Sequence, residues 1–426
     1  MSRRAGSRLA GRRRERRLDR RRLRRSVAAV SAIAVFLAVT AALVVSRLGA
    51  AVPGPALTAV VHREVVGSGV PPALPWPSVG QGAVSVPGAG VLVQSGAERP
   101  VPVASLTKIM TAYIVLRDHP VAPTASGPSL TMGPVDVAEA ARDAARNDTS
   151  VPVQVGERLT ERQLLNGLMV HSANNFADTL ARWDAGSIPG FVAKMNAEAA
   201  ALGMTSTHYV DADGVHAGSV STAADQLRLV ARAMTIPTFA AVVDQQTITE
   251  PLTGLLANYV QAVGTDGVIG VKSGFTQAAM GCVVLAADRT VDGRRVLVLA
   301  AVTGQRGFDA LGAAQSVALR LIDRAAAALR LGSVVPAGAQ VATVRTRWGG
   351  GAPASVVVAP KPVTLLEWPG TTVVWRVVPR RRLSVPLAAG APVGTLVVSD
   401  GTERVVQQVH SRQQVGAPPA AWRLWR

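Results

Sequence analysis

The sequence predicts an α+β fold, in which helices cover an antiparallel sheet, with an apolar N-terminal helix and a small all-β domain at the C-terminal end. Three observations support this prediction. One uncharged apolar segment lies near the N-terminus, helical periodicity and β-branched runs follow in the middle of the chain, and short Val-rich runs separated by Gly and Pro end it. The predicted segments are 1–25, 26–46, 47–80, 81–330, 336–412 and 413–426.

The first 25 residues concentrate the charge of the chain. They contribute +11 to the formal net charge of +18, because 13 Arg stand against only Glu15 and Asp19. Residues 26–46 carry no charge, and about 20 apolar residues suffice for a helix to cross a bilayer. The arginines predict a cytoplasmic N-terminal tail, a transmembrane signal-anchor and an exported remainder. A cleaved signal peptide is the alternative, since "RLGAAVPG" offers small residues for cleavage.

The rest of the composition argues against several classes of function. The remaining 401 residues carry only +7, so we expect no nucleic-acid partner. The six His lack metal-ligand spacing, and we expect no metal and no cofactor. The only thiol, Cys282, lies in an apolar run and is expected to be a small buried side chain.

Pro and Gly dominate residues 47–80, which predicts a spacer between the apolar helix and the folded part. The last segment, "VGAPPAAWRLWR", is too short to span a membrane. Two alternatives stand for this segment: it contacts lipid headgroups, or it is an ordinary tail.

The middle of the chain predicts helices on an antiparallel sheet. "GAVSVPGAGVLVQSG" predicts two short strands around a turn, and three further strands are expected at 268–276, 280–288 and 294–304. Asp292-Gly293 between the last two is a hairpin signal. An amphipathic helix is expected over 308–331.

Three earlier stretches predict helices. The run "VASLTKIMTAYIVLRDH" has apolar residues at helical spacing. Residues 159–186 begin with a capping-box pair, Thr160 and Gln163, and predict two helices broken near Ser172. Residues 189–204 predict another helix.

Ser105 and Lys108 lie one helical turn apart, so both side chains are expected on the same face. A serine hydroxyl becomes a strong nucleophile only when a nearby base removes its proton. A desolvated lysine has a lowered pKa and is able to act as that base. Ser105 at a helix N-terminus would also direct its backbone N–H at a developing oxyanion. Taken alone, a capping serine beside a solvated lysine explains the same spacing.

Two further motifs follow in the chain. "HSANNF" contains Ser172 and Asn174, a hydroxyl and an amide that would both face a cleft. "GVKSGFT" places Lys272, Ser273 and Gly274 on a predicted strand, where they would supply a cation, a hydroxyl and room for a closely approaching backbone. Each is weak evidence alone, because a helix break or a strand bulge gives the same letters.

The order of the three motifs is more informative than any one of them. S-x-x-K on a helix, S-x-N at a helix junction and K-S-G on a strand are typical of serine β-lactamases and penicillin-binding proteins. Together with "PVPVASLTKIMTAY", "GERLTERQLLNGLMVHSANNFADTLA" and "MNAEAAALGMTSTHYVDADGVH", they make residues 81–325 resemble the D-alanyl-D-alanine carboxypeptidases among the low-molecular-mass penicillin-binding proteins. The resemblance implies a β-lactamase/transpeptidase-like fold and an acyl-transfer hydrolase outside the membrane. Its substrate would be a peptidoglycan stem peptide ending in D-Ala–D-Ala, with β-lactams as inhibitors.

The resemblance also implies roles for single residues. Ser105 would be the nucleophile and Lys108 its base. Ser172 would relay a proton to the leaving D-alanine, and Asn174 would hold the peptide backbone.

The third motif would bind the substrate. By the same resemblance, Lys272 and Ser273 recognise the terminal carboxylate, Gly274 allows close approach, and Thr276 lines the site. The backbone N–H of Phe275 would form the oxyanion hole with that of the nucleophile.

Two positions depart from the family pattern. Ser273 stands where Thr is usual, which keeps the hydroxyl and removes a methyl group. Asn175 stands where Asp often follows S-x-N, so the resemblance does not predict which contacts this side chain makes behind the site.

Three other functions are alternatives to this one. A class A β-lactamase would need a deacylating Glu in an E-x-x-L-N loop, and residues 175–270 contain no such string. A D,D-endopeptidase or transpeptidase would form the same acyl-enzyme and remains an alternative. So does a catalytically silent cell-wall-binding protein, although the intact motifs argue against it.

Overall fold

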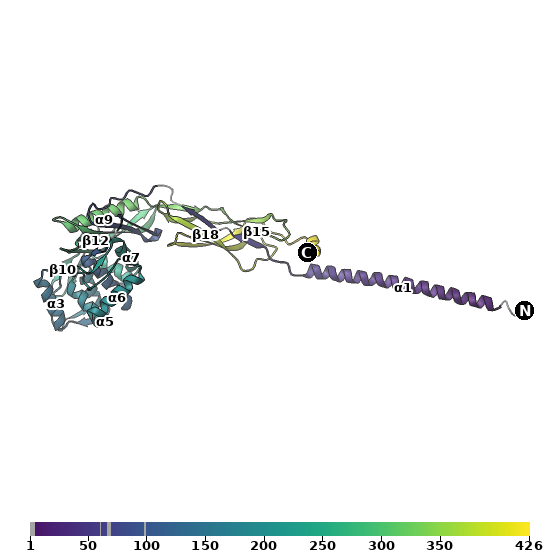
Figure 1. Ribbon diagram of the computed structural model, residues 1–426, viewed down its shortest axis with the longest axis horizontal. Coiled ribbons are helices and arrows are strands. Elements are labelled where there is room, and N and C mark those ends of the chain that lie inside the picture. The colour runs from purple at the N-terminus through teal and green to yellow at the C-terminus, as the bar shows by residue number, and fades with distance from the viewer. Residues whose placement is uncertain (1–4, 60, 66–69, 98) are drawn as a thin grey trace.

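The computed structural model describes residues 5–59, 61–65, 70–97 and 99–426. Figure 1 shows three parts in a row: a long N-terminal helix, a β-rich unit, and a mixed helix-and-sheet unit at the far end. The C-terminus lies where the long helix meets the β-rich unit.

The long helix α1 runs without a break over Ala5–Gly49. The described part of the predicted basic tail and the predicted apolar segment therefore form one helix. An 18-residue window within Arg21–Gly49 has a mean hydropathy of 2.6, and none of it is buried against the rest of the chain. This length and composition suit a membrane span, and a signal sequence has the same properties.

A five-stranded antiparallel sheet forms the centre of the mixed unit, in the order β11-β12-β13-β3-β4. Its strands are β3 Gln81–Val86, β4 Val91–Gln94, β11 Val268–Thr276, β12 Met280–Val291 and β13 Arg294–Gln305. The predicted hairpin is present, and both of its central residues, Asp292 and Gly293, have positive φ as a type I′ turn requires.

Both faces of this sheet are covered, because its strands bury apolar side chains on alternate sides. Leu285 and Val298 pack under helix α9 Ala310–Ala326, whereas Ala286 and Leu299 pack against the other helices. Those helices are α2 Thr107–Asp118, α3 Pro134–Ala145, α4 Glu161–Met169, α5 Asn174–Ala185, α6 Ile188–Ala201, α7 Ala223–Ala233 and α8 Pro237–Val243.

Local sequence signals account for the helix boundaries near the site. Thr160 and Gln163 form the predicted capping box of α4. The predicted break near Ser172 separates α4 from α5. Three short strand pairs brace the helical part: β5 Val101–Pro102 with β8 Val220–Ser221, β6 Ser129–Thr131 with β7 Arg158–Thr160, and β9 Thr247–Glu250 with β10 Gly254–Ala257.

The β-rich unit contains a seven-stranded sheet in the order β1-β15-β16-β20-β19-β18-β2, and a separate β14-β17 pair. Its strands are β1 Ala56–Ala59, β2 Val61–Val65, β14 Arg330–Val335, β15 Gln340–Arg345, β16 Pro353–Val358, β17 Val363–Glu367, β18 Thr372–Pro379, β19 Pro392–Ser399 and β20 Arg404–Ser411.

The prediction that residues 47–80 form a spacer is wrong for part of that segment. β1 pairs with β15 and β2 pairs with β18, so both become the edges of the C-terminal sheet. Each strand is short, and its partner strand lies about 300 residues later in the chain. Local sequence therefore could not reveal this pairing.

Candidate active site

Ser105 lies in a 3₁₀ turn, Ala104–Leu106, directly before helix α2. Ala104 has φ +49°, a left-handed conformation that non-glycine residues seldom adopt outside special sites. Lys108 lies in the first turn of α2, and its ammonium donates a hydrogen bond of 3.0 Å to Ser105 Oγ. The predicted juxtaposition of the two side chains is present.

Lys108 is completely buried, and its two other hydrogen bonds come from distant parts of the chain. Its Nζ donates to Asn174 Oδ1 at 2.6 Å and to the Asp213 carbonyl at 2.7 Å. Burial lowers the pKa of Lys108, because the charged form loses its hydration. A lowered pKa increases the fraction of neutral amine that is able to accept the proton of Ser105.

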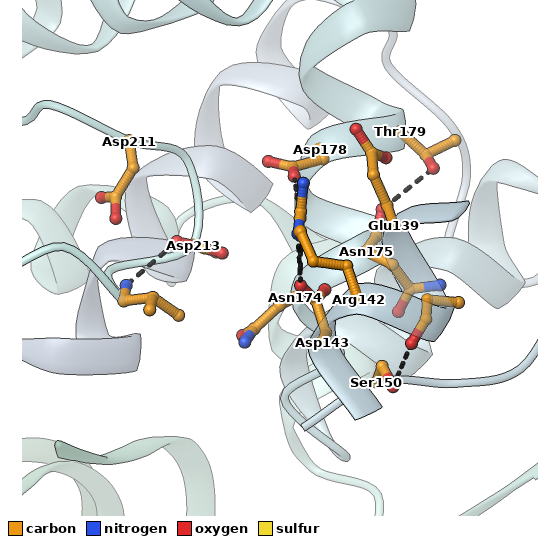
Figure 2. A network of polar contacts seen from close by, with 12 residues as sticks. Glu139, Arg142, Asp143, Ser150, Asn174, Asn175, Asp178, Thr179, Asp211 and Asp213 are labelled. Atoms are coloured by element: carbon orange, nitrogen blue, oxygen red, sulfur yellow. Dashed lines mark hydrogen bonds and ion pairs between the residues drawn. The ribbon is translucent and has the colours of Figure 1, made fainter. Parts of the chain in front are cut away.

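A group of acidic residues, labelled in Figure 2, opposes this effect. Its members are the carboxylates whose charges raise the pKa of Lys108, in decreasing order Asp213, Asp211, Asp178 and Asp143. Burial, together with the neighbouring Asp211, raises the pKa of Asp213 to about 7, although the charge of Lys108 acts in the opposite direction. Burial raises the pKa of Asp178 to about 6, with Glu139 adding to the shift. The charge of this group, and with it the basicity of Lys108, therefore varies near neutral pH.

The second motif occupies the junction between α4 and α5. Ser172 has φ +65° and is buried, and Asn174 begins α5 while its backbone N–H donates to the Thr149 carbonyl at 2.9 Å. Asn175 points away from Lys108, accepting from Val151 N–H at 3.1 Å and donating to Val151 C=O at 2.9 Å. An amide satisfies both groups of Val151, and an ionised carboxylate would not. This pairing explains why Asn suits position 175.

The third motif runs along edge strand β11 beside the Ser105 turn. A Cβ atom on Gly274 would lie 2.7 Å from Ser105 N, so the close approach predicted there requires glycine. Phe275 is 46% exposed at the rim. The Thr276 hydroxyl accepts the Ala279 N–H at 3.1 Å and thereby holds the turn that follows.

The family resemblance predicts that Lys272 lies in the cleft, in contact with the substrate carboxylate. The structure places it elsewhere. Its side chain is completely buried, and its Nζ donates to the Ser273 carbonyl at 2.9 Å. Burial lowers its pKa well below the usual value, and the charge of Lys108 adds to the shift. Lys272 therefore lies behind the wall of the cleft, where it holds the backbone of Ser273.

The motifs meet at one cavity of about 240 Å³. Among the described residues, the side chains and backbone that line it are Ser105, Asn147, Asp148, Thr149, Ser172, Asn174, Val215, Tyr259, Ser273, Gly274, Phe275, Thr276 and Leu311. Seven of the nine candidate residues predicted from the sequence are in this set. Lys108 and Lys272 lie immediately behind it.

Sequence reasoning missed several residues of the site. The loop Asn147–Thr149, Tyr259 and Leu311 carry no motif and reach the cavity only through the fold. Asp211 and Asp213 do carry a signal, because they are the two acids of the turn "DADG". A Cβ on Gly214 in that turn would lie 1.9 Å from the Ala104 carbonyl oxygen, so this glycine lets the acidic turn pack against the nucleophile.

His171 and Cys282 have structural environments outside the cavity lining. His171 stacks on Tyr259 with ring centroids 5.2 Å apart and does not line the cavity. Cys282 is buried in β12, and burial raises the pKa of its thiol to about 11. A thiol with this pKa is unreactive at neutral pH.

Comparison with known proteins agrees with this geometry. The sequence profile of the D-alanyl-D-alanine carboxypeptidases, peptidase S11, matches residues 84–305, which is just over half of the chain and includes all three motifs. The chain belongs to this family. The profile ends where the sheet of the mixed unit ends, so the β-rich unit lies outside the match.

Similar members come from several bacteria. D-alanyl-D-alanine carboxypeptidase DacB2 of Mycobacterium tuberculosis is 35% identical over 210 residues, which cover 48% of this chain and 67% of that protein. The Streptomyces K15 DD-transpeptidase structure is 28% identical, with a TM-score of 0.51 over 60% of this chain and 98% of that one.

A third relative extends the likeness to the β-rich unit. Penicillin-binding protein 5 from Haemophilus influenzae has a TM-score of 0.57 at 19% identity, covering 82% of this chain and 100% of that one. At this identity the likeness concerns the fold alone. It supports the predicted α+β penicillin-binding-protein fold, and the family is one of serine-type peptidases of the cell wall.

Proposed function

We propose that this chain is a serine D,D-carboxypeptidase that removes the terminal D-alanine from peptidoglycan stem pentapeptides. Its catalytic unit would lie on the outer side of the cell membrane, tethered by α1. The observation that carries the proposal is the 3.0 Å contact between Ser105 Oγ and the buried Nζ of Lys108, at the floor of a cavity lined by all three motifs.

The reaction follows from this contact. Ser105 Oγ attacks the carbonyl carbon of the D-Ala–D-Ala bond while its proton moves to Lys108 Nζ. Collapse of the tetrahedral adduct breaks the C–N bond, and the proton reaches the leaving nitrogen with the Ser172 hydroxyl as relay. Water then attacks the ester, its proton moves to Lys108, and the ester C–O bond breaks. Ser105 takes back a proton as the shortened peptide leaves.

Backbone N–H groups would stabilise the negative oxygen of the adduct. The N–H of Ser105 belongs to the turn that starts α2, and the N–H of Phe275 follows Gly274, which packs against that turn. Two N–H groups converging on one oxygen are the usual form of an oxyanion hole. Removing one such donor typically costs about 10²–10³ in kcat.

The terminal carboxylate would be bound mainly by hydroxyl groups. Ser273 and Thr276 line the cavity, and Asp148 is the single charged side chain among the described lining residues. The buried Lys272 would hold Ser273 in place from behind the cleft. β-Lactams, whose ring resembles the D-Ala–D-Ala end, would acylate the same Ser105.

Intact-mass analysis of the full chain in detergent tests this proposal. Incubation with a penicillin should add one acyl group, and incubation with a stem pentapeptide ending in D-Ala–D-Ala should release D-alanine. Both results should be lost in Ser105→Ala and retained in Ser150→Ala, a control serine outside the cavity lining. A wild-type protein that neither gains mass nor releases D-alanine would refute the proposal.

A transpeptidase is the second candidate, because the chain resembles the Streptomyces K15 DD-transpeptidase over nearly the whole of that protein. The two activities share the acyl-enzyme and differ in what attacks it. Adding an acceptor amine to the pentapeptide reaction separates them. A peptide–amine product formed in place of the hydrolysed peptide would identify a transpeptidase, and hydrolysis unaffected by the amine would identify a carboxypeptidase.

A further inference from the structure

The positive charge outside the N-terminal tail is concentrated at the C-terminal end of the sequence. Residues 26–330 hold 21 Lys or Arg and 22 Asp or Glu, so they are nearly neutral. Residues 331–426 hold 11 Lys or Arg and only three acids. The β-rich unit is therefore the basic part of the molecule.

The three acids lie toward the catalytic unit. Glu403 forms a 3.1 Å ion pair with Arg294 of β13, and Asp400 lines a hollow together with Gly90 and Val91. Glu367 is paired in register with Arg330, just after α9. Among the described residues of 331–426, the opposite end, next to α1, therefore has no acid.

Five exposed arginines lie at that opposite end, which we call the arginine collar: Arg345, Arg347, Arg380, Arg381 and Arg382. Arg345 pairs in register with Ala56. The connection between β18 and β19 contains Arg380–Arg382, which line a hollow together with Val52, Gly54 and Pro55. The collar therefore surrounds the chain just after α1 ends at Gly49. No ion pair joins it to an acid within the described part of the chain.

The C-terminal helix α10, Ala420–Trp425, adds aromatic side chains at the same level. Trp422 contacts Trp348 edge-on with ring centroids 5.6 Å apart, and the Arg426 guanidinium lies 5.5 Å from the Trp422 ring. Arg426 also donates to the Ala51 carbonyl at 3.1 Å, and Arg47 of α1 donates to the Arg426 carbonyl. Trp425 remains 89% exposed.

We propose that the arginine collar and α10 form a docking surface for anionic phospholipid headgroups of the outer leaflet. The inference rests on the proposed insertion of α1, which would bring the collar to the membrane surface. Six residues of chain, Ala50–Pro55, separate α1 from β1, and an extended chain of that length spans at most about 20 Å. Arginine is attracted to lipid phosphates near the surface, and tryptophan favours the level of the headgroups.

Docking would have a consequence for the enzyme. A single helix and a short connection leave the exported part free to tilt over the membrane. Contacts on several sides of α1 would hold the β-rich unit upright, with the catalytic unit at its far end (Figure 1). The active site would then be kept at a defined height above the bilayer.

Hydrogen exchange of the full chain in lipid nanodiscs tests the proposal. Discs of phosphatidylcholine alone are compared with discs that also contain phosphatidylglycerol. We expect amides of residues 378–387 and 418–426 to exchange about tenfold more slowly in the anionic discs, with the difference lost at high salt because exposed charges are screened. Equal exchange in both discs would overturn the proposal.

Charge-matched variants make the test specific. Arg380→Gln, Arg381→Gln and Arg382→Gln combined should abolish the protection by anionic lipid. Arg99→Gln, Arg158→Gln and Arg320→Gln combined remove the same charge from exposed positions of the catalytic unit and should leave the protection intact. Penicillin acylation should be unchanged in both triple variants. Loss of protection in both variants would indicate an effect of net charge and would contradict a specific surface.

Two further outcomes separate this inference from the proposals on which it rests. Extraction of the wild-type chain from membranes by alkaline carbonate would refute the insertion of α1 and the docking surface with it, and would leave the serine peptidase proposal standing. Protection by a soluble anionic wall polymer in neutral discs, as strong as that by phosphatidylglycerol, would assign the collar to that polymer and reject the lipid.

Discussion

The catalytic unit and the β-rich unit bury different kinds of side chain. The catalytic unit hides charged groups inside its fold, among them Lys108, Lys272, Asp213 and Glu250. In the β-rich unit, by contrast, the buried polar side chains among the described residues from Val335 onward are uncharged: Thr346, Ser355 and Ser411. Its charges lie on the surface.

This difference indicates where each unit does its chemistry. Burying an ionisable group costs free energy and shifts its pKa, which is useful where a proton must be transferred. A surface charge attracts a partner over a distance. The catalytic unit is thus organised to change the reactivity of a few groups, and the β-rich unit to present charges on its surface.

The largest expected effect comes from one substitution made in both units. Lys108→Met removes the buried amine beside Ser105 and should slow acylation by penicillin about 10³-fold, as loss of a general base typically does. Lys361→Met removes an exposed amine of the β-rich unit and should leave the rate unchanged. Intact-mass kinetics measure both rates. A Lys108→Met variant that acylates at the wild-type rate would exclude Lys108 as the base.

A smaller effect is expected on stability at the second motif. Asn175→Asp replaces the donor to Val151 C=O and adds a buried carboxylate near Asp178 and Asp143. We expect a loss of about 2–3 kcal/mol in the free energy of unfolding at pH 8. The loss should shrink toward pH 5, because the protonated acid regains a donor.

Denaturant unfolding at the two pH values measures this effect. Asn196→Asp is a control on a half-buried amide outside the acidic group, since Asn196 bonds to Tyr209. It should show the weaker pH dependence of the two. Equal stability of wild type and Asn175→Asp at pH 8 would mean that the Val151 pairing does not select the amide.

The smallest effect concerns a buried acid that no neighbour satisfies. Glu250 is 1% exposed, neither of its carboxylate oxygens has a hydrogen-bond partner among the described residues, and burial raises its pKa to about 7, with Glu157 adding to the shift. Because this folded-state pKa lies above the unfolded value, stability falls as the pH rises from about 4.5 to 7.

Glu250→Gln removes this titration. It should raise the melting temperature relative to wild type at pH 8, by the equivalent of about 1 kcal/mol or more, with no gain at pH 4. Glu403→Gln in the β-rich unit breaks a half-exposed ion pair and should change stability by less than about 1 kcal/mol. A gain of the same size at both pH values for Glu250→Gln would show that Glu250 does not titrate in this range.

Much of the catalytic unit could be predicted from the sequence because its signals are local. The helix containing Lys108, the break at Ser172 and the Asp292-Gly293 hairpin depend on residues within about ten positions of each other. The helix Pro134–Ala145 was not predicted, and neither were the acids Asp143 and Asp178 behind Lys108. Their relation to the site arises from the packing of α3 and α5.

Three features follow from local residue patterns: the order and spacing of the three motifs, the apolar segment before Gly49 and the apolar strands of the central sheet. Three others appear only in the folded chain: Lys108 is desolvated yet surrounded by carboxylates, Lys272 lies behind the cleft, and residues 56–65 contribute to the C-terminal sheet. One cause explains the division. Helix turns and hairpins depend on neighbours in the chain, whereas burial, the pKa of a lysine and the pairing of an edge strand depend on groups brought together by folding.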